Sequence, residues 1–134
     1  FFPRAFVGNK LVYQKNQEPE TLLDAMVAEG IADAFAKDLY PDLDPQWTNA
    51  LSPEAEAMVW PKVRRRLAVS DTSEIRRLLS GDNDRIPQWS GYTIGYKLVK
   101  GYLDRHSAKP SSLVSMTART ISKGSGYQAE AVSV

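Results

Sequence analysis

The chain has 134 residues, of which 43% are hydrophobic and 25% are charged, with a formal net charge of +1 and no cysteine. This composition is that of one globular domain with enough chain to bury a core, and the lack of cysteine excludes disulfides, thiolate nucleophiles and cysteine-based metal sites. The near-neutral charge favours neither nucleic acid nor an anionic membrane as a partner, and no apolar run reaches the roughly 20 residues needed to cross a bilayer.

The N-terminal segment carries few structural signals. The sequence begins at Phe1 without an initiator methionine, and its first methionine is Met26, inside a predicted helix. We therefore expect a processed, trimmed or partial chain. Because residues 1–17 carry weak structural signals, we expect them to form an irregular segment.

The first predicted helix covers about 19–39 and ends before Pro41. Pro19 suits a first helical turn, and the acidic residues on either side of it suit the helix dipole. The helix is apolar around most of its circumference, which is typical of a central, buried helix.

Further helices are expected downstream. Ser52 is a suitable N-cap for one helix, which Pro61 should kink. Asp71 and Glu74 resemble a capping box at the start of the next helix, and Gly81 is a natural end for it. The sequence predicts a mostly α fold, a single helical domain of five or six helices over 18–127, with a loose tail over 128–134. The further helices are placed at about 53–68, 71–81, 91–106 and 111–122.

Two carboxylates stand out on the first helix. Glu29 and Asp33 are four residues apart in its most apolar stretch, so both point to the same side. A carboxylate on an apolar face needs a partner, because an unpaired buried charge is very costly. One reading is a metal ligand with a neighbouring carboxylate that orients a metal-bound histidine. The other is a buried carboxylate paired with an arginine.

Tyr92 and Tyr96 form a second pair at helical spacing, and Gly91 and Gly95 each precede one of them. Glycines at this spacing allow another backbone or a ligand to approach closely. A tyrosine hydroxyl directed into a cleft can donate to a developing oxyanion. The alternative is that both rings pack in the core and bond nearby carbonyls, as buried tyrosines usually do.

The remaining polar features favour simpler roles. His106 is the only histidine, so the chain cannot form a multi-histidine metal site, and its position suits a helix C-terminus. Arg64, Arg65 and Arg66 fan around a helix, which favours solvated or ion-paired surface over a nucleic-acid patch.

Two segments together resemble a known family. The run Glu29-Gly30-Ile31-Ala32-Asp33 resembles the Glu-x-x-x-Asp element of the thermolysin-like zincins, the gluzincins. With the stretch Pro-Gln-Trp-Ser-Gly-Tyr-Thr-Ile-Gly-Tyr over 87–96, it resembles the YjaZ-like family of predicted Zn-dependent proteases, over about 20–127. The resemblance implies the helical C-terminal part of a metalloprotease that cleaves peptide or protein substrates with a zinc-activated water.

The resemblance also implies residue roles. Glu29 corresponds to the third protein ligand of zinc in the intact protein. Asp33 corresponds to the carboxylate behind a zinc-bound histidine. Tyr92 or Tyr96 is implied as a transition-state donor.

The chain departs from the family pattern because it contains no His-Glu-x-x-His motif. Either the motif lies upstream, which the missing initiator methionine favours, or the zinc site has been lost. In both cases we expect no zinc bound to this chain alone and no hydrolysis by it. The alternative function is a non-catalytic helical interaction module that binds through a cleft around Trp89, Tyr92 and Tyr96.

Overall fold

The computed structural model describes residues 20–127, and within that range the chain is helical, with no β-strand. The mostly α, single-domain fold is therefore confirmed. The segments expected to be irregular over 1–17 and loose over 128–134 lie outside the described residues. The elements are α2 (Leu22–Leu39), η2 (Gln46–Thr48), α3 (Pro53–Arg64), α4 (Thr72–Ser80), α5 (Ser90–His106), η3 (Pro110–Leu113) and α6 (Ala118–Gly124), where η denotes a 3-10 helix.

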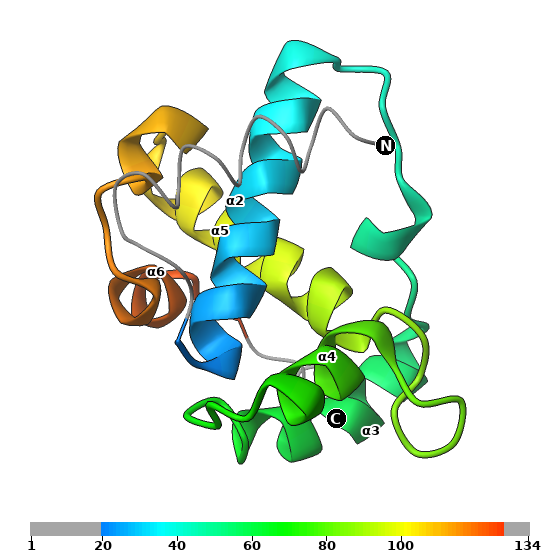
Figure 1. Cartoon of the computed structure of the whole chain (residues 1–134). Helices are drawn as coiled ribbons and strands as arrows, with labels where there is room; N and C mark the ends of the chain where they lie inside the picture. Colours follow the sequence, from blue (N-terminus) through cyan, green and yellow to red (C-terminus); the bar gives the residue numbers. More distant parts are fainter. Residues whose placement is uncertain (1–19, 128–134) are drawn as a thin grey trace.

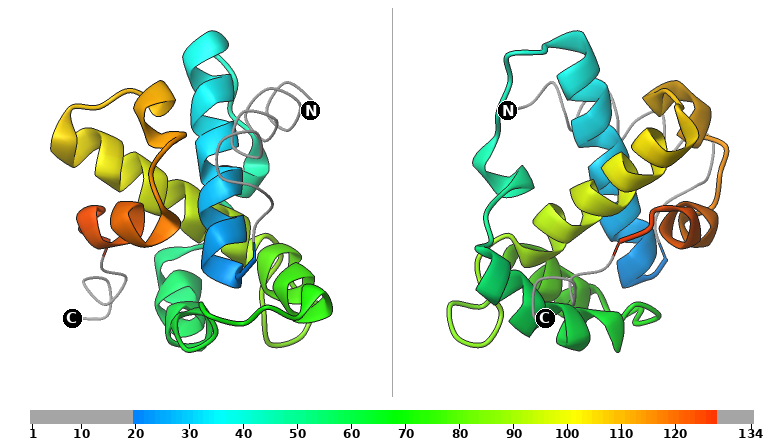
Figure 2. Two further views of the ribbon diagram at one scale, coloured as in Figure 1. Left: turned by 60° about the vertical axis from the view of Figure 1, so that its left-hand side comes forward. Right: turned by 180° about the vertical axis from the view of Figure 1, so that it is seen from behind.

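Helices α2 and α5 cross at the centre of the domain (Figures 1 and 2). A Cβ added at Gly30 would lie only 2.5 Å from the Gly95 carbonyl oxygen, and a Cβ at Gly95 would overlap the backbone of Met26. The two backbones can touch only because both residues lack side chains. The close backbone approach expected at Gly95 is therefore confirmed.

The core surrounds this crossing. Helices α4 and α6 pack against both α2 and α5, η3 packs against α2, and α3 packs against α5. Nearly every side of α2 is covered, which confirms that it is the central helix. None of the described helices is long and apolar enough to span a membrane. The largest fully buried side chains include Leu22, Met26, Ile31, Leu78, Ile94, Leu98, Leu113 and Ile121.

The start of α2 differs from the prediction. The helix begins at Leu22, not at 19, because Thr21 is its N-cap and forms a capping box with Asp24. The Leu22 and Leu23 amides donate to the carbonyls of Val69 and Leu67. A distant loop therefore satisfies amides that the first helical turn leaves without intrahelical partners.

Two other helices are shorter than predicted. Helix α3 ends at Arg64, with Pro61 in its last turn, because the following chain turns away and supplies the carbonyls that bond α2. The single helix predicted over 111–122 is two elements, η3 and α6. Thr117 starts the second by accepting a hydrogen bond from the Thr120 amide.

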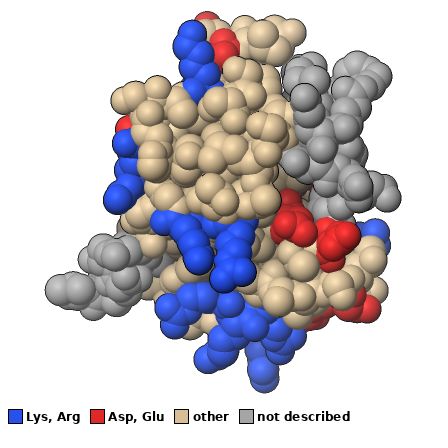
Figure 3. Space-filling view, turned by 90° about the vertical axis from the view of Figure 1, so that its left-hand side faces the viewer, with Lys and Arg blue, Asp and Glu red and all other residues tan. Residues whose placement is uncertain are grey.

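The arginine-rich turn after α3 is partly ion-paired. The capping box predicted at Asp71 forms only in one direction: Asp71 accepts from the Glu74 amide, while the Glu74 carboxylate accepts from Arg66 and Arg77. Figure 3 shows basic side chains gathered low on one face, at the height of α3 and α4, with acidic side chains beside them.

Candidate functional site

Helix α2 carries both carboxylates singled out in the sequence. Glu29 is half-buried, and Asp33, one turn later, is buried at 3% exposure. The indole Nε1–H of Trp47, in η2, donates to Asp33 Oδ1 at 3.1 Å. The predicted pair is thus on one helix, and a tryptophan from the following loop holds its second member.

Trp47 is itself fixed in place. Its carbonyl accepts from the Thr93 hydroxyl at 2.7 Å, and the same hydroxyl accepts from the Ala50 amide at 3.1 Å. Its ring meets Trp89 edge-on, with centroids 6.4 Å apart. These contacts hold the loop across α2 and α5. Sequence reasoning did not assign Trp47 to the site, although a buried indole N–H usually needs an acceptor.

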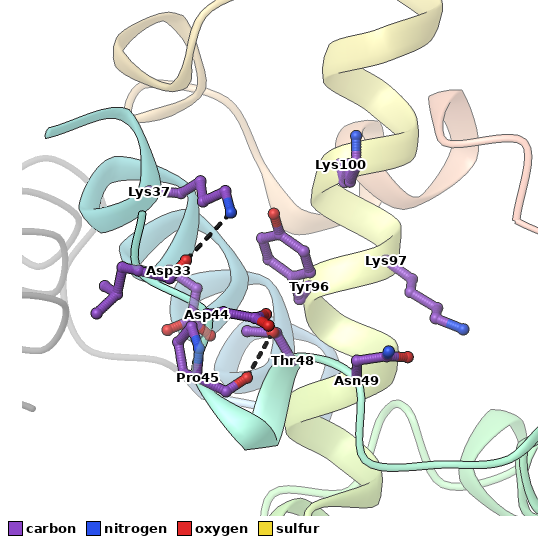
Figure 4. Close-up of a pocket in the computed structure, with 10 residues that line it drawn as sticks. Asp33, Lys37, Asp44, Pro45, Thr48, Asn49, Tyr96, Lys97 and Lys100 are labelled. Atoms are coloured by element: carbon purple, nitrogen blue, oxygen red, sulfur yellow. Dashed lines mark hydrogen bonds between the residues drawn. The ribbon is translucent and has the colours of Figure 1, made fainter. Parts of the chain in front are cut away.

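A cavity of about 230 Å³ opens between α2, α5 and this loop (Figure 4). Asp33 and Lys37 line it from α2, and Tyr96 lines it from α5. Lys37 Nζ donates to the Leu43 carbonyl at 3.1 Å, which draws the lysine across the cavity. The fold therefore brings Asp33 and Tyr96 to one space, whereas Glu29 and Tyr92 do not line it.

The Tyr96 hydroxyl is suited to act as a neutral donor. Burial raises the pKa of Tyr96 above its ordinary value, and nearby Lys100 only partly opposes this shift. Within residues 20–127 no hydrogen bond joins this hydroxyl to another group. Both half-buried tyrosine rings pack against the core, but Tyr92 does not line this cavity. The sequence could not separate the two tyrosines, and the structure places only Tyr96 at this cavity.

His106 is the last residue of α5 and is exposed, which agrees with its predicted place at a helix C-terminus. Its ring stacks on Tyr102 with centroids 4.1 Å apart, and its Nε2 lies 3.3 Å from the Gly124 carbonyl oxygen. It does not line the cavity beside Asp33.

The described residues do not by themselves fit a zinc ion. Across 20–127, no three histidine, cysteine, aspartate or glutamate side chains gather closely enough to hold a metal. A catalytic zinc takes three protein ligands and keeps a further position open. Glu29 and Asp33 have suitable oxygen donors, but this part of the chain does not complete the set.

The chain matches the family described as predicted Zn-dependent protease (DUF2268) over residues 10–123. The chain belongs to this family. It is also 28% identical over 109 residues to the uncharacterized protein YjfC of Bacillus subtilis (strain 168). That match covers 73% of this chain and 36% of YjfC, so the chain spans little more than a third of this curated relative. No solved structure matches the chain.

Family membership confirms the resemblance noted in the sequence at the level of a predicted zinc-dependent protease. The finer likeness to gluzincins and to the YjaZ-like group remains a prediction. The same holds for the roles assigned to Glu29, Asp33, Tyr92 and Tyr96.

Proposed function

We propose that this chain is the helical part of a zinc-dependent metallopeptidase, with peptides or proteins as substrates, in which Glu29 supplies one zinc ligand of the intact protein. The observation that carries the proposal is the burial of Asp33 one turn after Glu29, with its carboxylate held by Trp47. Burying a carboxylate on an apolar helix is costly. A fixed carboxylate beside a zinc-ligating residue is what a zinc-bound histidine needs to hold its ring in place.

The roles divide among three side chains. Glu29 would coordinate the metal, and Asp33 would accept the free ring N–H of a zinc-bound histidine. Tyr96 is preferred to Tyr92 as the donor to a developing oxyanion, because Tyr96 lines the cavity beside Asp33 and Tyr92 does not. The other zinc ligands must come from outside residues 20–127, so this chain alone should neither bind zinc tightly nor hydrolyse peptides.

Zinc content of the full-length protein tests the ligand role of Glu29. Glu29→Gln should reduce bound zinc from about one equivalent to a small fraction of it. Asp33→Asn should leave the ligands in place and weaken zinc affinity by about 10- to 100-fold. Asp38→Asn, which removes an exposed carboxylate from the same helix, is the matched control and should retain full zinc. Circular dichroism of each variant would report whether the fold is intact.

Full zinc occupancy in folded Glu29→Gln protein would overturn the ligand assignment. The second candidate function is a helical peptide-binding module that uses no zinc. It is favoured by the hollows beside Trp89 and Tyr96. A folded full-length protein that takes up no zinc would support this second function over the first.

A further inference from the structure

Three hollows follow one another along α5. The first, of about 350 Å³, lies beside Trp89 at the start of the helix. The second is the 230 Å³ cavity beside Asp33 and Tyr96, and the third, of about 380 Å³, reaches Leu103 near the helix end. Asn49 lines both the first and the second, while Tyr96 lines both the second and the third. Neighbouring hollows therefore share walls and form one row.

The length of this row suits a short extended chain. Trp89 immediately precedes α5 and Leu103 lies in its last turns, so at about 1.5 Å per residue the two are about 21 Å apart along the helix. An extended peptide spans about 3.4 Å per residue, so about six residues would fill the row.

The first hollow has the chemistry of a site for a neutral peptide main chain. Gln46, Asn49 and Gln88 contribute exposed side-chain amides, and no charged residue lines it. In the described part of the chain, no hydrogen bond joins these side-chain amides to another group. A primary amide both donates and accepts, and so complements main-chain N–H and C=O groups. Pro87 and Trp89 add apolar surface.

The backbone at Trp89 is held in an unusual conformation. Its φ is 63° and its ψ is 25°, in the left-handed region that bulky residues rarely occupy. Its amide donates to the Ser80 carbonyl at 2.8 Å, and its carbonyl accepts from the Thr93 amide at 2.9 Å. Strain of this kind tends to persist at ligand sites, where the surrounding structure enforces it. Here it places the indole in the wall of the first hollow.

We propose that this row of hollows binds an extended peptide of about six residues. Asn49 and Gln88 bond its main chain, and a neutral side chain packs on Trp89. The charged residues of the peptide lie farther along, where Lys37 and Lys100 line the row. The inference rests on the proposed function, because the row passes Asp33 and Tyr96, to which that function assigns roles, although Glu29 does not line it.

Indole NMR signals of the ¹⁵N-labelled chain provide a direct readout. The chain has three tryptophans, Trp47, Trp60 and Trp89. The probe is a library of N-acetylated, C-amidated hexapeptides built from Ala, Leu, Phe, Gln and Ser, with Glu or Lys in the half that lies beside the charged hollows. It should shift the Trp89 signal. Trp60, which packs edge-on against Tyr127 with centroids 5.0 Å apart, should not shift and is the internal reference. Trp60→Phe and Trp89→Phe would assign the signals.

Alanine variants identify the bonding amides. Asn49→Ala and Gln88→Ala should each raise the peptide concentration at half-maximal shift by roughly three- to tenfold. Ser73→Ala, an exposed change on α4, should leave it unchanged. A Trp89 signal that does not shift at millimolar peptide would overturn the proposal, and so would amide variants that both bind the peptide as tightly as the unmodified chain does. So would a shift produced by cellohexaose and not by the peptides.

The two tests fail independently. Zinc content of the full-length protein involves no peptide, and peptide binding to this chain involves no zinc. Loss of zinc in Glu29→Gln with no peptide binding would overturn the peptide site alone. Peptide binding with full zinc in that variant would overturn the ligand assignment alone.

Discussion

Trp47 donates its indole N–H to the buried carboxylate of Asp33 at 3.1 Å, although the two residues belong to different elements. The Thr93 hydroxyl, on α5, bonds the Trp47 carbonyl at the same place. One short loop is thereby tied to both crossing helices. The position of Asp33, and any role that it has in the site, depends on this loop.

Replacing Trp47 by Phe should destabilise the fold. The ring remains apolar, but a buried carboxylate loses a donor, and such losses cost about 1–3 kcal/mol. Urea unfolding followed by circular dichroism would measure the change. In an Asp33→Asn background, Trp47→Phe should lower the free energy of unfolding by a smaller amount. A buried neutral amide that lacks a hydrogen-bond donor is less destabilising than a buried carboxylate that lacks one. Equal costs in both backgrounds would show that the bond to Asp33 contributes nothing measurable.

Gly95→Ala should separate the crossing helices. The new methyl group would overlap the Met26 backbone, which cannot move aside as a flexible side chain can. Overpacking of this kind costs about 1–3 kcal/mol or more, despite the better helix propensity of alanine. Thermal unfolding would detect it, with Lys100→Ala on the exposed side of α5 as the control. Unchanged stability would mean that the helices are farther apart than described.

Lys97→Met should destabilise the fold much more than Lys100→Met does. Glu56, at 4% exposure, accepts from Lys97 Nζ and from the Tyr127 hydroxyl, both at 2.5 Å. Without the lysine, the buried Glu56 carboxylate lacks a positive partner and one hydrogen-bond donor. We expect the free energy of unfolding to fall by about 1–3 kcal/mol. Lys100 pairs with the exposed Asp104, where losses stay below about 1 kcal/mol. Chemical denaturation of the two variants compares the pairs, and equal losses would contradict this ranking.

The loop after α4 should make stability depend on acidic pH. A hydrogen bond from the Ile86 amide is the largest cause that lowers the pKa of Asp82 to about 2, and Arg77 adds to it. Because the folded pKa is depressed, the stabilisation is present above the ordinary pKa of 3.8 and is lost as the pH falls toward 2.

Thermal midpoints measured from pH 5 to pH 2 should therefore fall less steeply in Asp82→Asn than in the unmodified chain. Asp84→Asn, which replaces an exposed carboxylate in the same loop, is the control for a general change of charge. Identical slopes in Asp82→Asn and the unmodified chain would rule out the contribution of Asp82.

The sequence by itself determined the features that depend on near neighbours in the chain. Ser52 and Asp71 cap the helices predicted after them, and Gly81 ends α4 with a positive φ. The apolar circumference of α2 predicted its central place, and a spacing of four residues put Glu29 and Asp33 one turn apart. Local hydrogen bonding and helical periodicity decide these features, so they can be read from short stretches of sequence.

Only the tertiary structure decided the features that join distant segments. It showed Trp47 as a partner of Asp33, and it placed Tyr96 rather than Tyr92 at the cavity. It also moved the start of α2 to Leu22, whose amide bonds the Val69 carbonyl. Each of these depends on where the crossing of α2 and α5 places other parts of the chain. That crossing is set by backbone contact at Gly30 and Gly95. The glycine spacing indicated a close approach at Gly95, but no local pattern identified the α2 backbone as its partner.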